Sequence, residues 1–265
     1  MTTLIIITVV GLLTGLAIAI VSYFFATPAN PLQDQVLELL PGANCGGCGF
    51  AGCGGYAEAL AQGKAKPGLC SAQSTANLQK LTALLGTTAE KKEPMVAVVL
   101  CSGDNSHASR RAQYNGINDC RDASQVAGGA KSCNYGCLGM GSCARACPFG
   151  AIEITEHGIA LVHRELCRGC GSCVAVCPKK LIRLVPKSAS LHVFCSSPLK
   201  GILKRNACSV ACIGCGKCFR AAPDNIIMEP GKFLAQVNYD NPPPEELACQ
   251  CPTGALRSKK RFMEG

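Results

Sequence analysis

The stretch CRGCGSCVAVCP, residues 167–178, decides the fold of this 265-residue chain. Its four cysteines are spaced C-x2-C-x2-C-x3-C and a proline follows them, a run typical of four-iron cluster ligation. Three of the thiolates are expected to hold one cluster, while the fourth, turned away by the proline, ligates a neighbouring cluster. A zinc site needs only four ligands, arranged in two pairs, so the run favours iron–sulfur chemistry.

A second cysteine group lies upstream, at residues 133–148, and departs from the run at one position. Counted back from Cys147, the run requires cysteines at 143, 140 and 137, but the middle position is Met140. Cys133 is close enough in sequence to replace the missing ligand. The alternative, a degenerate site without a cluster, is weaker because this replacement thiolate is near. The expected ligand sets are Cys133, Cys137, Cys143 and Cys177 for one cluster and Cys147, Cys167, Cys170 and Cys173 for the other.

The C-terminal part repeats this arrangement with one cluster deleted. Ala222 occupies the position of the remote cysteine before a proline, and the three cysteines that the run requires upstream of Cys251 are absent as well. All four ligands of one cluster are therefore missing together, whereas the other set is complete. The complete set is Cys212, Cys215, Cys218 and Cys251.

The N-terminal cysteine group has a different spacing, C-x2-C-x4-C-x16-C, and begins in NCGGCGFAGCGGYA, residues 44–57. The glycines let backbone amides approach the sulfurs, and hydrogen bonds to sulfur tune a cluster's reduction potential. Four zinc ligands are the rival interpretation. Iron–sulfur is favoured because the rest of the chain already uses that chemistry. The expected ligands are Cys45, Cys48, Cys53 and Cys70.

The overall cysteine usage also favours metal over disulfides. The chain has 21 cysteines and no Trp, so something other than apolar burial must hold it together. Neighbours at two-residue spacing seldom form disulfides, and an odd count fits a disulfide framework poorly. Five cysteines stand outside the four sets, and a buried free thiol is the plain expectation for each, although together they are enough to ligate another cluster. They are Cys101, Cys120, Cys195, Cys208 and Cys249.

The formal net charge of the chain is +9. Each four-iron cluster with its thiolates carries about −2, so four clusters would lower the net charge to about +1. A nucleic-acid partner is therefore not favoured. The remaining basic groups are read as solvated surface, or else as a docking site for an acidic redox partner or anionic lipid. No phosphate loop or dinucleotide fingerprint is present, so flavin and NAD are not expected in this chain, nor are catalytic residues. The basic groups are Lys179, Lys180, Arg183 and Lys187, and the tail residues Arg257, Lys259, Lys260 and Arg261.

The N-terminus carries an apolar stretch, Leu4 to Ala26, long enough to span a bilayer. No basic residue precedes it, and aromatic residues close it, so an anchor is favoured over a signal peptide. Every Lys and Arg lies after the stretch, and the positive-inside rule therefore predicts that the rest of the chain is on the cytoplasmic side of the inner membrane. Reduced thiols fit that compartment.

The expected fold class is α+β, built from an anchor helix, a small helical four-cysteine domain and two ferredoxin-like domains, the last degenerate. Two predicted hairpins, at 151–163 and 225–238, each lie between cysteine groups, which indicates a duplication. A buried strand is predicted at 95–101 and a short amphipathic helix at 32–40. The expected boundaries are 1–27 for the anchor, 28–94 for the N-terminal cluster domain, 95–130 for a connecting segment, 131–190 for the two-cluster domain and 191–265 for the one-cluster domain.

With its anchor, its N-terminal glycine-rich cysteine group and DCRDASQVAGGAKSCNYGCLGMGSCARACPFGAI at 119–152, the chain resembles the B subunit of the Rnf complex over essentially its whole length. The resemblance implies an iron–sulfur subunit that receives electrons from soluble ferredoxin. Its complex couples ferredoxin oxidation and NAD reduction to sodium or proton translocation. NAD and flavin chemistry would belong to other Rnf subunits, and membrane lipid would surround the anchor.

Two rival functions remain from the sequence. The N-terminal cluster could serve a corrinoid or disulfide-reducing enzyme, although an anchor helix counts against this. Alternatively, the clusters could act only as folding staples. With four clusters of four irons, about sixteen irons per chain are expected.

Overall fold

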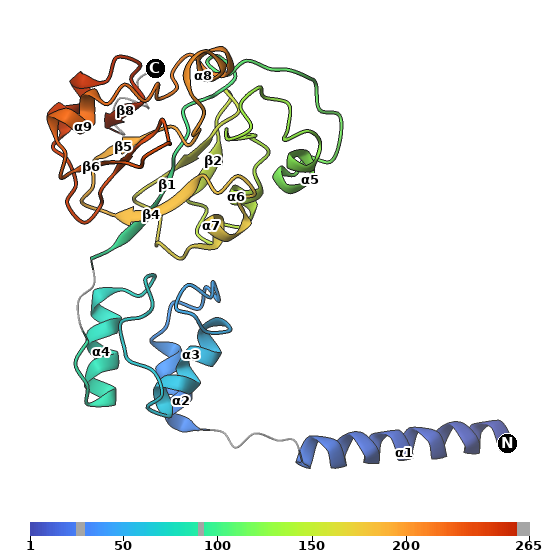
Figure 1. Ribbon diagram of the computed structural model, residues 1–265. Helices are drawn as coiled ribbons and strands as arrows, with labels where there is room; N and C mark the ends of the chain where they lie inside the picture. The colour runs from blue at the N-terminus through green and yellow to red at the C-terminus, as the bar shows by residue number, and fades with distance from the viewer. Residues whose placement is uncertain (25–29, 90–92, 259–265) are drawn as a thin grey trace.

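The computed structural model describes residues 1–24, 30–89 and 93–258. Helix α1 (Thr2–Phe24) comes first (Figure 1). Its window Ile5–Phe24 has a mean hydropathy of 2.6, and none of it is buried. By length and composition α1 could cross a membrane, as the sequence predicts. The predicted end of the apolar stretch, Ala26, lies outside the described residues.

A helical unit follows, residues 30–89, built from α2 (Pro31–Glu38), α3 (Gly52–Ala61) and α4 (Thr75–Leu85). The side chains of Asn30 and Ser74 accept amide hydrogens that α2 and α4 leave unpaired at their first turns. The three helices enclose a small core that includes a buried tyrosine and three of the unit's cysteines. The helix predicted at 32–40 is thus confirmed.

The first β unit, residues 93–190, consists of four short strands paired in a nested order. The outer strands β1 (Met95–Val99) and β4 (Ile182–Pro186) pair antiparallel, and the inner strands β2 (Ile152–Ile154) and β3 (Ala160–Val162) form a hairpin. The hairpin predicted at 151–163 is confirmed. Ribbon β1·β4 lies at the centre of the larger part of the molecule (Figure 1).

Strand β1 has a larger role than the sequence indicated. Its residues were expected at the start of a connecting segment, yet β1 is the strand that closes the first β unit against β4. The physical reason is that β1 is buried on both faces. Val96 and Val98 pack with Val185, whereas Ala97 and Val99 face a second cluster of buried side chains that includes several cysteines.

The second β unit, residues 191–258, repeats the nested order. Strands β5 (Leu191–Val193) and β8 (Leu256–Ser258) pair outside, and β6 (Ile226–Met228) and β7 (Ala235–Val237) form the inner hairpin. The hairpin predicted at 225–238 is therefore confirmed too. Phe194, next to β5, packs against the valines of the β1·β4 ribbon. The two β units thus share a packed junction.

Short helices lie between the strands, and each one contains or borders a cysteine. They are α5 (Cys120–Gln125), α6 (Ser142–Arg145), α7 (Ser172–Val176), α8 (Gly201–Ala207), α9 (Lys217–Ala221) and the 3₁₀ helix η1 (Glu245–Gln250). Three of them start from a glycine in the left-handed region, Gly141, Gly171 and Gly216, with φ of 77°, 82° and 70°. Such angles strain any residue with a Cβ. The glycines thus let the chain turn sharply around each cysteine group.

Candidate metal centres

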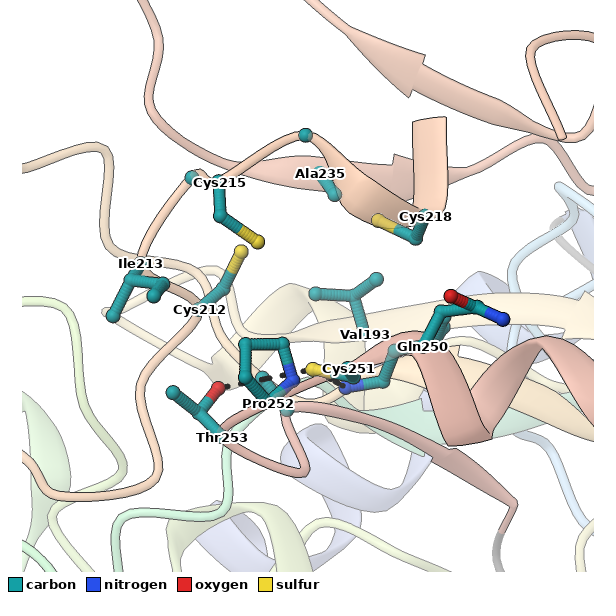
Figure 2. Close-up of a pocket in the computed structure, with 14 residues that line it drawn as sticks. Val193, Cys212, Ile213, Cys215, Cys218, Ala235, Gln250, Cys251, Pro252 and Thr253 are labelled. Atoms are coloured by element: carbon teal, nitrogen blue, oxygen red, sulfur yellow. Dashed lines mark hydrogen bonds between the residues drawn. The ribbon is translucent and has the colours of Figure 1, made fainter. Parts of the chain in front are cut away.

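The C-terminal cysteines converge on one cavity, as Figure 2 shows. The amide of Leu256 donates to the Sγ of Cys251 at 3.3 Å. Burial raises the pKa of the Cys218 thiol to about 11, and neighbouring cysteine thiolates add to the rise. We call this group quartet 4; it consists of Cys212, Cys215, Cys218 and Cys251.

A second group lies in the first β unit and matches its expected members. Burial raises the pKa of the Cys173 thiol to about 12, and the next largest causes are the nearby thiolates of Cys167 and Cys170. Backbone amides donate to two of the sulfurs, from Ala97 to Cys167 at 3.3 Å and from Ala151 at 3.4 Å to the remote cysteine. This group is quartet 2, Cys147, Cys167, Cys170 and Cys173.

The third group differs from the expected set at one position. Its cavity is lined by Cys120 and not by Cys133. Burial raises the pKa of the Cys143 thiol to about 12, and the thiolates of three cysteines, Cys120 among them, add to the rise. We call the group quartet 3; it consists of Cys120, Cys137, Cys143 and Cys177.

A clamp of polar contacts explains why Cys120 reaches this cavity. Asp119 accepts hydrogen bonds from Ser142 Oγ at 2.9 Å and from Arg145 Nη2 at 2.8 Å. The amide of Cys120 donates to the same Ser142 Oγ at 2.8 Å. These contacts fasten the first turn of α5 to α6, the helix that carries Cys143. The cysteine spacing does not predict these contacts, because sixteen residues separate Cys120 from Cys137.

The N-terminal cysteines come together in the helical unit, as expected. Burial raises the pKa of the Cys70 thiol, and the thiolates of Cys48 and Cys45 add to the rise. The Tyr56 hydroxyl donates to a backbone carbonyl at 2.9 Å and accepts the Leu69 amide at 3.3 Å, which holds the segment before Cys70 against α3. We call this group quartet 1, Cys45, Cys48, Cys53 and Cys70.

Quartets 1 and 2 approach one another through a glycine. A methyl group added at Gly47 would stand 2.6 Å from the carbonyl oxygen of Cys170 and 2.9 Å from its Cα. The charge of Cys170 also raises the pKa of Cys45, after the larger effect of burial. The helical unit therefore meets the first β unit through the cysteine loops themselves.

The spacing within the quartets fits a cluster better than a single ion. In the described parts of the chain, no three Cys, His, Asp or Glu side chains converge closely enough to hold one metal ion. Zinc would bind all of its ligands at one atom, with sulfurs about 2.3 Å from it. A four-iron cluster binds each thiolate at a different iron, so its ligands stand further apart. Each donor set also consists of four cysteine sulfurs, the usual ligands of a [4Fe–4S] cluster.

Two protein families match parts of the sequence. The family described as "Putative Fe-S cluster" matches residues 40–71, which contain all of quartet 1. The family described as "4Fe-4S dicluster domain" matches residues 132–181, which contain quartet 2 and three members of quartet 3. Both matches thus fall on cysteine groups that the structure brings together.

Several curated proteins are similar over most of the chain. The B subunit of the proton-translocating ferredoxin:NAD(+) oxidoreductase complex of Clostridium ljungdahlii is 40% identical over 258 residues, 96% of this chain and 91% of that protein. The B subunit of the ion-translocating oxidoreductase complex of Methanosarcina acetivorans is 40% identical over 230 residues, 87% of each chain. The B subunit of the Na(+)-translocating ferredoxin:NAD(+) oxidoreductase complex of Acetobacterium woodii is 39% identical over 204 residues, 77% of this chain and 61% of that protein.

Proposed function

Because the chain belongs to the B-subunit family of the Rnf complexes, the ion-translocating ferredoxin:NAD+ oxidoreductases, we propose that it accepts electrons from ferredoxin and relays them to other subunits. It is a subunit of an oxidoreductase complex and has iron–sulfur domains, which gives it a role in electron transfer. The main support for the relay is the series of contacts between neighbouring cysteine quartets. Clusters held at these quartets would supply the redox chemistry, and each would take up and release one electron at a time.

The proposed ligands are the four quartets, each holding one [4Fe–4S] cluster. Fifteen of these sixteen cysteines are the ones expected from the sequence; Cys120 takes the place of Cys133. Quartets 2 and 3 lie side by side, since the thiolate of Cys143 in one raises the pKa of Cys173 in the other. Quartet 1 touches quartet 2 through Gly47. The role of the protein in the relay is therefore to hold the thiolates and amide donors in place and to bury them.

We place the cysteine-bearing units on the cytoplasmic side of a membrane that α1 spans, in contact with other Rnf subunits and with lipid. The apolar side chains of α1 are exposed, as a lipid-facing helix requires. No cysteine in the described residues forms a disulfide, and reduced thiols suit the cytoplasm. The 26 Lys and Arg residues of the sequence follow the apolar stretch, which supports the same orientation.

Membrane vesicles of opposite orientation test both the proposed electron donor and the side of the membrane on which it acts. Inside-out vesicles that contain the complex, mixed anaerobically with reduced ferredoxin, are expected to show the EPR signals of reduced clusters. Right-side-out vesicles are expected to show only the signal of ferredoxin itself, because ferredoxin cannot cross the bilayer. Vesicles from cells that lack this chain are the control. Clusters that dithionite reduces but ferredoxin does not, in either orientation, would contradict the proposed donor.

Replacing Cys120 tests the ligand set of quartet 3. The full-length Cys120→Ala variant, purified anaerobically, is expected to lose about four irons per chain, because one cluster loses a ligand from a buried site. Iron and acid-labile sulfide are counted together. The matched control is Cys249→Ala, since Cys249 is exposed and belongs to none of the four quartets. Equal iron contents in the two variants would show that Cys120 is not a ligand.

A further inference from the structure

A separate cavity between the two β units is lined by four cysteines that belong to none of the four quartets. Three of them are cysteines that no sequence motif includes, and the fourth is Cys133, the residue that quartet 3 leaves out. We call this group quartet 5; it consists of Cys101, Cys133, Cys195 and Cys208. Of the 21 cysteines, Cys249 then remains outside the five quartets.

The members of quartet 5 come from four separate segments that the fold brings to one place. Cys101 follows strand β1, and Cys195 follows β5. Cys208 ends α8, which is tied to the loop after β1 by a hydrogen bond from the Ser109 amide to the Ala207 carbonyl, 3.2 Å long. No two members are closer in sequence than thirteen residues, so no spacing motif marks the site.

The cavity of quartet 5 resembles those of the other quartets in size and lining. Its volume is about 20 Å3, the same as for the cavities of quartets 3 and 4. Each of the three cavities is lined by four cysteines, and most of the other lining residues are small or apolar. The fold thus repeats the same type of space at a place where no sequence motif predicts one.

Backbone amides approach the sulfurs of quartet 5 as they do in the other quartets. The amides of Gly103 and Cys137 both donate to the Sγ of Cys101, each at 3.4 Å. The other three members, Cys133, Cys195 and Cys208, line the same cavity as Cys101. Amide hydrogen bonds to sulfur are contacts of the kind that cluster ligands accept.

Two buried lysines give an independent reason to expect a negative charge at quartet 5. Lys131 and Lys204 are 4% and 1% exposed. Their ammonium groups donate to backbone carbonyls, Lys131 to Gly103 at 2.7 Å and Lys204 to Phe233 at 2.7 Å. Among the described residues neither has a carboxylate within ion-pair distance. A buried cation without a counter-charge is costly, and four thiols would not supply one.

We propose that Cys101, Cys133, Cys195 and Cys208 bind a fifth [4Fe–4S] cluster, whose negative charge balances the buried ammonium groups of Lys131 and Lys204. An oxidised cluster with its four thiolates carries about −2, which matches the two lysines. The proposal rests on the proposed function only in taking the chain to bind such clusters. It does not depend on which protein donates the electron.

The fifth cluster would connect two parts of the relay that otherwise stand apart. On one side, Cys101 accepts the amide hydrogen of Cys137, a member of quartet 3. On the other side, the thiolate of Cys195 raises the pKa of Cys212, a member of quartet 4. The clusters then follow one another in the order of quartets 1, 2, 3, 5 and 4. One electron accepted from quartet 3 leaves to quartet 4, or the reverse, so the cluster returns to its starting charge.

Metal counting on the full-length chain tests the fifth cluster. The anaerobically purified protein is expected to contain about twenty irons and as many acid-labile sulfides, against about sixteen for four clusters. The double variant Cys195→Ala/Cys208→Ala is expected to lose about four irons and one reduced-cluster spin in EPR. Cys249→Ala is the matched control and is expected to lose nothing. Zinc is measured in the same samples by mass spectrometry.

Several results would overturn the proposal. The first is an iron content of about sixteen per unaltered chain. The second is one zinc per chain that is lost in the double variant. The third is a double variant whose iron content is unchanged. Should the double variant fail to fold, the iron and spin counts of the unaltered chain decide by themselves. Ferredoxin-dependent reduction is measured separately, so the fifth cluster and the proposed donor can fail independently.

Discussion

Anaerobic removal of iron is expected to unfold the helical unit and both β units, while α1 stays helical in detergent. The strands are three to five residues long, and buried cysteines are core members in each unit. Cysteine ligation therefore supplies much of the stability that a larger apolar core would supply. Structural zinc in small peptide domains contributes on the order of 10 kcal/mol, and a contribution of that order from each cluster would be as large as the whole stability of a small domain.

Loss of the thiolates also leaves the buried lysines without a counter-charge. Burial raises the pKa of Cys101, Cys143 and Cys173 to about 12 each, so without iron these sulfurs are protonated at neutral pH and the buried lysines keep no counter-charge. Far-UV circular dichroism and a thermal melt measure the loss, and reconstitution with iron and sulfide is the control for reversibility. An iron-free chain that still melts cooperatively near the temperature of the loaded chain would contradict the prediction.

Gly47→Ala is expected to separate quartet 1 from quartet 2 without removing either cluster. The added methyl group would overlap backbone atoms of Cys170, at 2.6 and 2.9 Å, and backbone cannot rotate away as a side chain can. Overpacking costs about 1–3 kcal/mol, which lowers the equilibrium constant for docking of the helical unit by about five- to 150-fold. Electron transfer between these two clusters should slow by up to that factor, because it occurs in the docked state.

Rapid freeze-quench EPR after a limiting pulse of reductant follows this transfer. Gly54→Ala is the matched control, since Gly54 lies in the same unit, on α3, and a methyl group there meets nothing within 4 Å. Iron content should be equal in both variants. An unchanged rate in Gly47→Ala would mean that electrons do not pass through this contact. A lower iron content would mean that the substitution damages the site rather than the docking.

Local patterns in the sequence predicted the hairpins and most of the cysteine groups. A cysteine run forces its ligands together because only two or three residues separate them, and a glycine-containing turn fixes each hairpin. These constraints act within a few residues, so they are visible in one sequence. They placed quartets 1, 2 and 4 on the same cysteines that the structure brings together.

Contacts between distant segments could not be predicted in this way. Cys120 reaches quartet 3 only through the clamp of Asp119, Ser142 and Arg145, and proximity in sequence favoured Cys133 instead. The pairing of β1 with β4 and the four-segment origin of quartet 5 depend likewise on tertiary packing. Gly47 is one glycine among many in its loop, and its closeness to Cys170 has no sequence signal.

Each half of the first β unit supplies one cysteine to the quartet of the other half, and this affects how the protein acquires its clusters. Cys147 belongs with the cysteines of the later half, and Cys177 with those of the earlier half, so neither proposed site has all its ligands until almost the whole unit has left the ribosome. The N-terminal helix is made long before that point. A nascent chain held at the membrane would thus present open thiols there, and iron–sulfur assembly factors would have to deliver both clusters at the membrane surface, nearly together.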